Sequence, residues 1–250
     1  NYAKLDLADL NTYTLRSKSG TNVLSLTKDA SSGSFTNGVG SVSLSAHLDR
    51  AGAANNFNAN WGVMITDSDG ISSTANTDLD ASAGNESTLL TSGIEHRFGI
   101  MMMQSSIGNS NVPINIPVQV LYRKNGGWAI NTIDNCTNLS SSNVFLGNLS
   151  GLSGTDINIL GTSGTLSSGK GSITIKSNAG KKGSLLVGVQ NSTSVAACGT
   201  FTQSNTSSSA NRNYLQSNMC GSAYDKDSTS KVVIGAGSTG GPVIYWKEKY

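Results

Sequence analysis

Acidic side chains at close spacing are the first residues of this chain whose types suggest chemistry. Residues 67–70 read Asp-Ser-Asp-Gly, and Asp78 follows a short way downstream. Hard cations such as calcium bind carboxylate and carbonyl oxygens gathered on a tight turn. The sequence therefore suggests calcium as the one candidate cofactor, with Asp67, Asp69 and Asp78 as ligands. The glycine comes too early for an EF-hand loop, so a solvated β-turn in which the aspartates cap backbone amides is the alternative.

Other residues with catalytic side chains do not form a recognisable constellation. Asp225 and Asp227 are a second, weaker calcium candidate. His47 stands in an alternating, strand-like segment, and His96 is flanked by Glu95 and an arginine. Neither histidine lies near a nucleophile elbow or a partner at metal-ligand spacing. We therefore expect no catalytic residues and a protein that is not an enzyme.

Three cysteines leave one thiol over after a single pairing. In an exported protein an odd count indicates one disulfide plus a free or intermolecular thiol. Cys198 and Cys220 enclose a segment rich in Ser, Thr and Asn, and we favour this pair over a bridge that includes Cys136. Closing that loop is worth about 3 kcal/mol in the chain-entropy model. Cys136 is then free or joins two molecules.

The composition that must position these residues is that of a β protein. Glycine is abundant, only 13% of residues are charged, and the net charge is +2. Surfaces of hydroxyls and amides with Gly, Asn and Ser turns are typical of secreted bacterial proteins. The basic residues are scattered, which argues against a nucleic-acid partner, and no apolar run is long enough for a membrane span. The first residues read as mature sequence, without a signal peptide.

Short alternating segments separated by turn residues recur along the whole chain, and they predict strands. Examples are residues 12–16, 42–46, 173–175 and 185–189. The fold class we predict is all-β, with two antiparallel β-sandwich domains of the Ig-like, Greek-key or jelly-roll kind. We place the domains at 1–93 and 94–250.

Local signals fill in the second domain. The pair Asn125-Gly126 between two apolar segments predicts a hairpin, because both residues tolerate positive φ. Trp128 is expected to pack on the face of this hairpin. Residues 101–103, three methionines, are expected to fill the core from a central strand. Residues 138–170 read as loops and short edge strands.

The two ends of the chain suggest self-assembly. Residues 1–10 form a candidate extended arm, in which apolar and polar residues alternate and which could add as a strand to the sheet of a neighbouring copy. The alternative is that this segment is simply the first strand of the first domain. The candidate assembly residues at the two ends are Leu5, Leu7, Leu10, Ile244 and Trp246.

Several segments, taken in order, resemble one family. They carry an acidic turn, a His-Arg-Phe-Gly-Ile strand, a hairpin with Gly-Trp, an Asn-Cys-Thr motif and an acidic turn that leads to an Ile-Tyr-Trp-Lys-Glu ending. Together they resemble the C-terminal domain of MshQ-like proteins, which are long bacterial surface proteins associated with mannose-sensitive haemagglutinin (type IV) pili. The resemblance implies surface attachment and no catalytic residue. The segments are 65–70, 96–100, 113–122, 127–128, 131–137, 224–227 and 244–248.

The function we expect is that of a secreted, structural or adhesive β protein of a bacterial cell surface, pilus or fimbrium. Its partners would be other copies of itself, pilus or surface proteins, or surface glycans. A self-assembling extracellular filament subunit, a homopolymer joined by strand addition, is the leading alternative. A carbohydrate-binding module is a lesser one, in which Trp61, Trp128 or Trp246 would stack on sugar rings.

Overall fold

The computed structural model describes the backbone of residues 10–19, 22–24, 26–36, 39–48, 52–67, 88–199, 201–204 and 212–235. Side chains are described at 43, 52–62, 92–199, 201 and 212–235. The chain divides into two compact units, the first within 1–51 and 56–97 and the second within 52–55 and 98–250. The predicted division between residues 93 and 94 falls inside a strand, and the domain bounds stay a prediction. No helix among the described residues has the length and apolar character needed to cross a bilayer.

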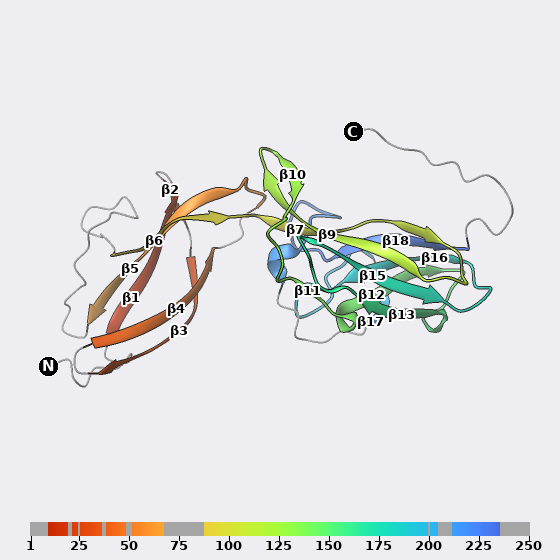
Figure 1. The fold of residues 1–250 in the computed structure, drawn as a ribbon, viewed down its shortest axis with the longest axis horizontal. Helices are drawn as coiled ribbons and strands as arrows, with labels where there is room; N and C mark the ends of the chain where they lie inside the picture. The colour runs from red at the N-terminus through yellow and green to blue at the C-terminus, as the bar shows by residue number, and fades with distance from the viewer. Residues whose placement is uncertain are drawn as a thin grey trace. The chain divides into compact units, whose positions relative to one another are not determined.

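The first unit consists of antiparallel strands (Figure 1). One sheet has the order β2-β1-β5-β6, and β3 and β4 form a separate pair. In that pair Thr36 lies opposite Val39, so the residues between the two strands are Asn37-Gly38. This dipeptide is the strongest short-range signal for a hairpin, and our sequence analysis overlooked it. The strands are β1 (Leu10–Ser19), β2 (Asn22–Leu24), β3 (Leu26–Thr36), β4 (Val39–Leu48), β5 (Phe57–Asp67) and β6 (Thr88–His96).

The second unit contains two five-stranded sheets and a two-stranded pair, β11-β14. We call the first large sheet the β9 sheet; its order is β10-β9-β15-β13, with β7 also paired to β9. The other, the β16 sheet, has the order β17-β12-β16-β18-β8. All pairs are antiparallel except β18 with β8. The elements are β7 (Gly99–Met103), β8 (Ser106–Gly108), β9 (Ile114–Lys124), β10 (Gly127–Ile130), β11 (Asn138–Leu139), η3 (Ser141–Asn143), β12 (Val144–Ser150), η4 (Gly154–Asp156), β13 (Ile157–Thr162), β14 (Gly164–Thr165), β15 (Lys170–Ser177), β16 (Gly183–Val189), β17 (Phe201–Ser204), η5 (Asn213–Leu215) and β18 (Ser228–Ile234).

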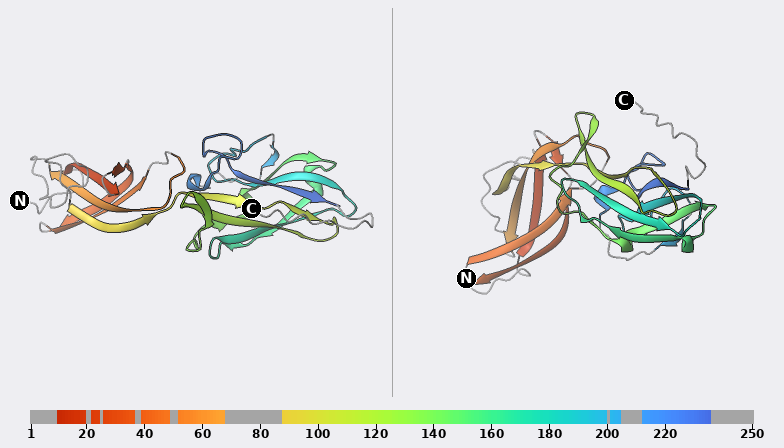
Figure 2. Two further views of the ribbon diagram at one scale, coloured as in Figure 1. Left: turned by 90° about the horizontal axis from the view of Figure 1, so that it is seen from above. Right: turned by 45° about the vertical axis from the view of Figure 1, so that its right-hand side comes forward.

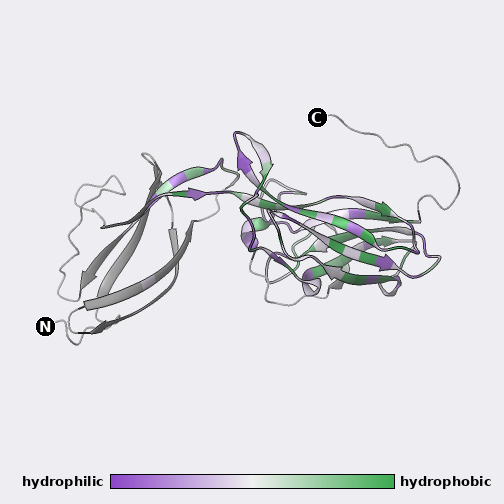
Figure 3. Ribbon diagram, viewed as in Figure 1, coloured by the Kyte–Doolittle hydropathy of each residue, from purple (hydrophilic) through white to green (hydrophobic). Residues whose placement is uncertain are grey.

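The β9 and β16 sheets of the second unit face one another across a single apolar core (Figures 1 and 2). Apolar residues recur at every second position of the strands, which brings one face of each sheet into the core. The alternation is visible along the strands in Figure 3. This arrangement is sandwich-like, and it confirms the all-β fold class. The core residues include Ile116, Val118, Ile173 and Ile175 from the β9 sheet, and Leu146, Leu185, Val187 and Val232 from the β16 sheet.

The Asn-Gly hairpin is confirmed, whereas the position of the methionine strand is not. Asn125 and Gly126 have φ of 51° and 79°, and they join β9 to β10. Residues 101–103 lie in β7, which among the described strands pairs only with β9 and is therefore an edge strand, not a central one. Met101 and Met103 are buried as expected, but Met102 points outward and is half exposed. Alternation along an edge strand leaves every second residue outside the core.

Gly188 makes room for a fully buried aromatic side chain of the β16 sheet, Phe145. Phe145 lies directly opposite Gly188 in the β12-β16 register, and its ring would overlap any Cβ placed at Gly188. The ring is fully buried and meets Phe201 edge-on, at 4.6 Å between centroids. A glycine inside a strand often marks such a close approach.

Candidate functional site

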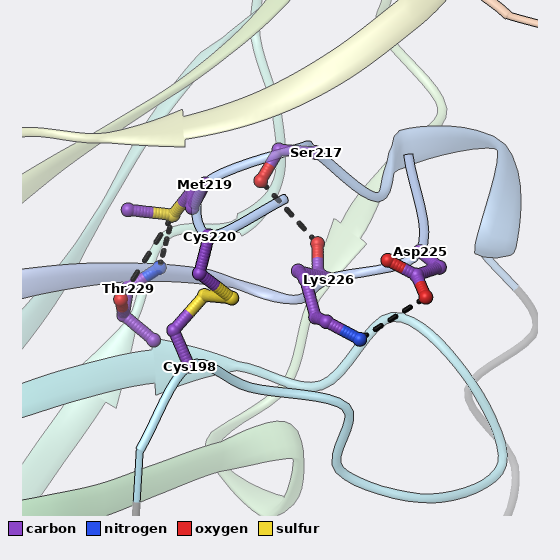
Figure 4. Close-up of a disulfide and its surroundings, with 7 residues drawn as sticks. All are labelled: Cys198, Ser217, Met219, Cys220, Asp225, Lys226 and Thr229. Atoms are coloured by element: carbon purple, nitrogen blue, oxygen red, sulfur yellow. Dashed lines mark hydrogen bonds and ion pairs between the residues drawn. A yellow bond between two sulfur atoms is a disulfide. The ribbon is translucent and has the colours of Figure 1, made fainter. Parts of the chain in front are cut away.

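A disulfide fastens the long connection between β16 and β18. Cys198 follows β16, Cys220 precedes β18, and their sequence separation is 22 residues. This is the pairing that the sequence favours. In Figure 4 the bridge lies beside Met219 and Thr229, and the Thr229 amide donates a hydrogen bond to the Met219 sulfur at 3.4 Å. The bridge therefore ties two points of the connection together, and the neighbouring Met219 contacts the start of β18.

Asp227 is the second fastening of the same connection, and it is completely buried. Its Oδ1 accepts the backbone N–H of Asn191 at 3.0 Å and the side-chain amide of Gln216 at 3.4 Å. Its Oδ2 accepts the backbone N–H of Ala196 at 2.8 Å, and its own N–H donates to the Ala196 carbonyl at 2.7 Å. One carboxylate thus joins three separate points of the chain.

Burial shifts the pKa of Asp227 and the pKa of the neighbouring Arg212. Burial raises the pKa of Asp227, although the hydrogen bonds from Ala196, Asn191 and Gln216 and the positive charge of Arg212 pull it down. Burial also disfavours the charged form of Arg212, and so it lowers the pKa of this residue. Arg212 donates to the carbonyls of Asn138 and, at 2.7 Å, of Gln190. Apart from the Arg212 Nε, which has no partner among the described residues, the hydrogen bonds of both charged groups are made to the chain itself, and the arrangement is structural.

Around this pair lies a set of buried polar atoms with no hydrogen-bond partner in the described part of the chain. Gln190 and Asn191 are fully buried, yet the Gln190 Oε1 and both side-chain polar atoms of Asn191 make no hydrogen bond. The buried hydroxyl of Ser230, in β18, also has no hydrogen-bond partner among the described residues. Such atoms cost free energy, so the fastening of this region depends all the more on the bonds of Asp227 and Arg212.

Cys136, the third cysteine, is free and exposed. Its Sγ lies 3.6 Å from Asp134 Oδ1, which also accepts the backbone N–H groups of Cys136 and Thr137. Desolvation and the negative charge of Asp134 raise the pKa of the thiol. Because the thiolate is the reactive form, Cys136 is a weak nucleophile in this setting. A bridge from Cys136 to a second molecule stays a prediction.

Trp128 packs in an aromatic cluster at the Asn-Gly hairpin. Its ring lies 6.1 Å from Phe98 and 6.4 Å from Tyr224, and these two rings meet edge-on at 4.8 Å. The Arg123 guanidinium lies 5.5 Å from the Trp128 centroid, a cation–π contact. Trp128 therefore packs against its own unit, as expected, and this packing gives no support to a role in stacking on sugars.

The first unit has an aromatic stack of its own, centred on His96. The rings of Phe57 and Trp61 both lie close to the imidazole, at 5.4 and 5.6 Å between centroids. The Trp61 indole N–H donates to His96 Nε2 at 2.9 Å, and burial lowers the pKa of the histidine. The imidazole nitrogen that a general base would use is thus occupied by Trp61. The side chain of His47, in β4, is outside the described residues.

The structure does not test the main calcium candidate, because its side chains lie outside the described residues. Asp67 ends β5 with its side chain outside the described residues, and Asp69 and Asp78 are outside them altogether. The weaker calcium candidate, Asp225 with Asp227, is wrong. The exposed Asp225 accepts a hydrogen bond from Lys226 at 3.0 Å, whereas the side chain of Asp227 is buried and accepts hydrogen bonds from amides. Their oxygens do not share a site. No group of three or more His, Cys, Asp or Glu within the described ranges could hold a metal ion.

The assembly residues lie beyond what the structure describes. Leu10 begins β1, but its side chain is not described, and Leu5, Leu7, Ile244 and Trp246 are outside the described residues. Edge strands of the sheets in the second unit are among the described residues. Edge strand β13 carries a bulge between Ile159 and Gly161, and edge strand β8 has three residues. Bulged and short edges are features that discourage added strands.

The comparisons with known proteins identify the second unit. The family model for DUF6701, fourth domain, matches residues 97–249. This match covers more than half of the chain. The chain belongs to the DUF6701 family. The matched range nearly coincides with the main segment of the second unit, 98–250, so the disulfide, Asp227 and the aromatic cluster all belong to the DUF6701 domain.

No other comparison adds to this assignment. Neither the curated proteins nor the solved structures contain a match to this DUF6701 chain.

Proposed function

We propose that this DUF6701 chain is a secreted, non-enzymatic protein that serves in attachment at a bacterial surface or pilus-like appendage. The observation that carries the proposal is the double fastening of the β16–β18 connection by the Cys198–Cys220 disulfide and Asp227. A disulfide is typical of proteins exported to an oxidising compartment. Fastening a long polar connection at two points suits a module that presents its loops under mechanical tension.

The finer parts of the proposal rest on the sequence. The resemblance to the C-terminal domain of MshQ-like proteins supports a place on the cell surface in association with a pilus, and most of the resembling segments lie in the DUF6701 match. The sandwich-like second unit supports a pair of β-sandwich domains, with the first unit as the other member.

Attachment can be measured with the purified full chain coupled to fluorescent microspheres. We expect these microspheres to be retained on epithelial cell layers or on glass several times more often than microspheres coated with albumin, after equal washing. Soluble chain added in excess should compete with them and reduce retention. Equal retention of the two kinds of microsphere on every surface tested would overturn the proposal.

A further inference from the structure

A polar pocket lies beside β13 and β15 of the second unit and is separate from the disulfide region. Its volume is about 250 Å³, and it is lined by the β8–β9 connection, β13, the end of β15 and the turn that follows. This is a little below the roughly 300 Å³ at which pockets for drug-sized ligands begin, so it suits one small ring. The lining residues are Ser110, Asn111, Asn158, Lys176, Ser177, Asn178 and Ala179.

The pocket carries a positive charge that forms no ion pair with any described residue. Lys176 is partly buried on the outer face of the β9 sheet, directly opposite Asn158 in the β13-β15 register. Within the described part of the chain, its ammonium group makes no hydrogen bond or ion pair. No carboxylate lines the pocket. An ammonium group in such a place favours an anionic ligand.

Asp156, two residues before Asn158, already has partners of its own. Asp156 precedes β13, and its Oδ2 accepts the N–H and hydroxyl of Ser153 at 2.8 and 2.7 Å. Its Oδ1 lies 3.2 Å from the Lys181 ammonium. These contacts lower the pKa of Asp156. Asp156 therefore does not compete with a ligand for Lys176.

The exposed rim of the pocket is made of asparagine amides, and hydrogen bonds hold two of them. Asn158 donates to the Asn178 side-chain oxygen at 3.2 Å, and Asn178 donates in turn to the Thr155 carbonyl at 3.2 Å. The Asn111 backbone N–H is bound by Asn109, but its side-chain amide has no partner in the described residues. Amides offer both donors and acceptors, which is the chemistry that sugar hydroxyls require.

We propose that this pocket binds an acidic sugar residue, with the carboxylate on Lys176 and the ring hydroxyls on Asn111 and Asn158. A phosphate monoester is a poorer match, because the one ammonium group of the lining balances the single charge of a carboxylate but not the nearly double charge of a phosphate. This assignment names the ligand class for the proposed attachment function, and its biological meaning rests on that function.

Titration of the full chain with glucuronate and with glucose, followed by NMR chemical shifts, tests the pocket. We expect saturable shifts at the lining residues with glucuronate and at least about tenfold weaker binding of glucose, which lacks the carboxylate. K176A should weaken glucuronate binding by a similar factor. K170A is the matched control, because Lys170 lies on the same strand and face about 20 Å away; it should bind glucuronate as the wild type does.

Several outcomes would overturn the inference. These are the absence of saturable shifts with glucuronate, equal binding of glucose, and an equal loss of binding in K176A and K170A. The microsphere assay separates this inference from the proposed function. Attachment without glucuronate binding would overturn the pocket assignment alone, and glucuronate binding without attachment would overturn the proposed function alone.

Discussion

Replacing Asp227 by alanine is expected to lower the free energy of unfolding of the second unit by about 3 to 5 kcal/mol. The change leaves the N–H groups of Asn191, Ala196 and Gln216 without their acceptor in a place that water does not reach. It also removes the negative charge near the partly buried Arg212. Urea denaturation of the full chain, followed by near-UV circular dichroism, measures the loss.

Asp225→Ala is the matched control for this prediction. Asp225 is two residues away, but it is exposed, and among the described residues it pairs only with Lys226. An exposed pair of this kind contributes about 0 to 1 kcal/mol. A loss in D225A as large as that in D227A would show that Asp227 is not a fastening point.

The pH dependence gives an independent check on the same carboxylate. Because burial raises the pKa of Asp227 in the folded chain, the folded state binds its proton more readily than the unfolded state does. The resulting stability is fully present below the unfolded pKa and is lost as the pH rises through the folded pKa. We expect D227N to lack this part of the pH dependence, so the wild type minus D227N difference should fall with rising pH.

Removing the disulfide should have the second-largest effect, about 3 kcal/mol for the 22-residue separation of Cys198 and Cys220. The double variant C198A/C220A is expected to unfold at lower urea concentration because its unfolded chain gains the freedom of the opened loop. Cys136→Ser is the control, since Cys136 is free and exposed, and it should unfold like the wild type. Unchanged stability of the double variant would contradict the structural role of the bridge.

Local sequence signals predicted the parts of the second unit that depend on neighbouring residues. The Asn125-Gly126 turn needs positive φ at both positions, and these two residue types supply it. Residues 173–175 and 185–189 alternate clearly and lie in β15 and β16. The disulfide pairing, too, was favoured by the loop that it closes.

The sequence does not show which strand lies at the centre of a sheet, because strand order depends on contacts between distant segments. Residues 138–170 were expected to hold only loops and short edge strands. Instead β12, Val144–Ser150, lies inside the β16 sheet between β17 and β16. Gly147 interrupts the apolar residues of β12, so the sequence pattern did not show how long the strand is. The methionines of β7 show the opposite error, since an apolar segment turned out to be an edge strand.

The candidate site was harder to predict than the fold. Asp227 was considered only as a weak calcium ligand, because an aspartate next to Lys226 and Asp225 looks like part of a solvated turn. Its burial arises from the segment around Asn191 and Ala196, which is distant in the sequence. The polar pocket likewise combines residues of the β8–β9 connection with those of β13 and β15.

The central claim is that the disulfide and Asp227 make the second unit unfold as a whole when it is pulled. Stretching single molecules of the full chain by their ends tests this claim most directly. We expect the oxidised second unit to unfold in one step, at higher force than C198A/C220A. Its gain in length should be about 70 Å shorter than that of the double variant, because the segment between the cysteines cannot extend. Early, low-force peeling of the β16–β18 connection, at the same force in both proteins, would contradict the account.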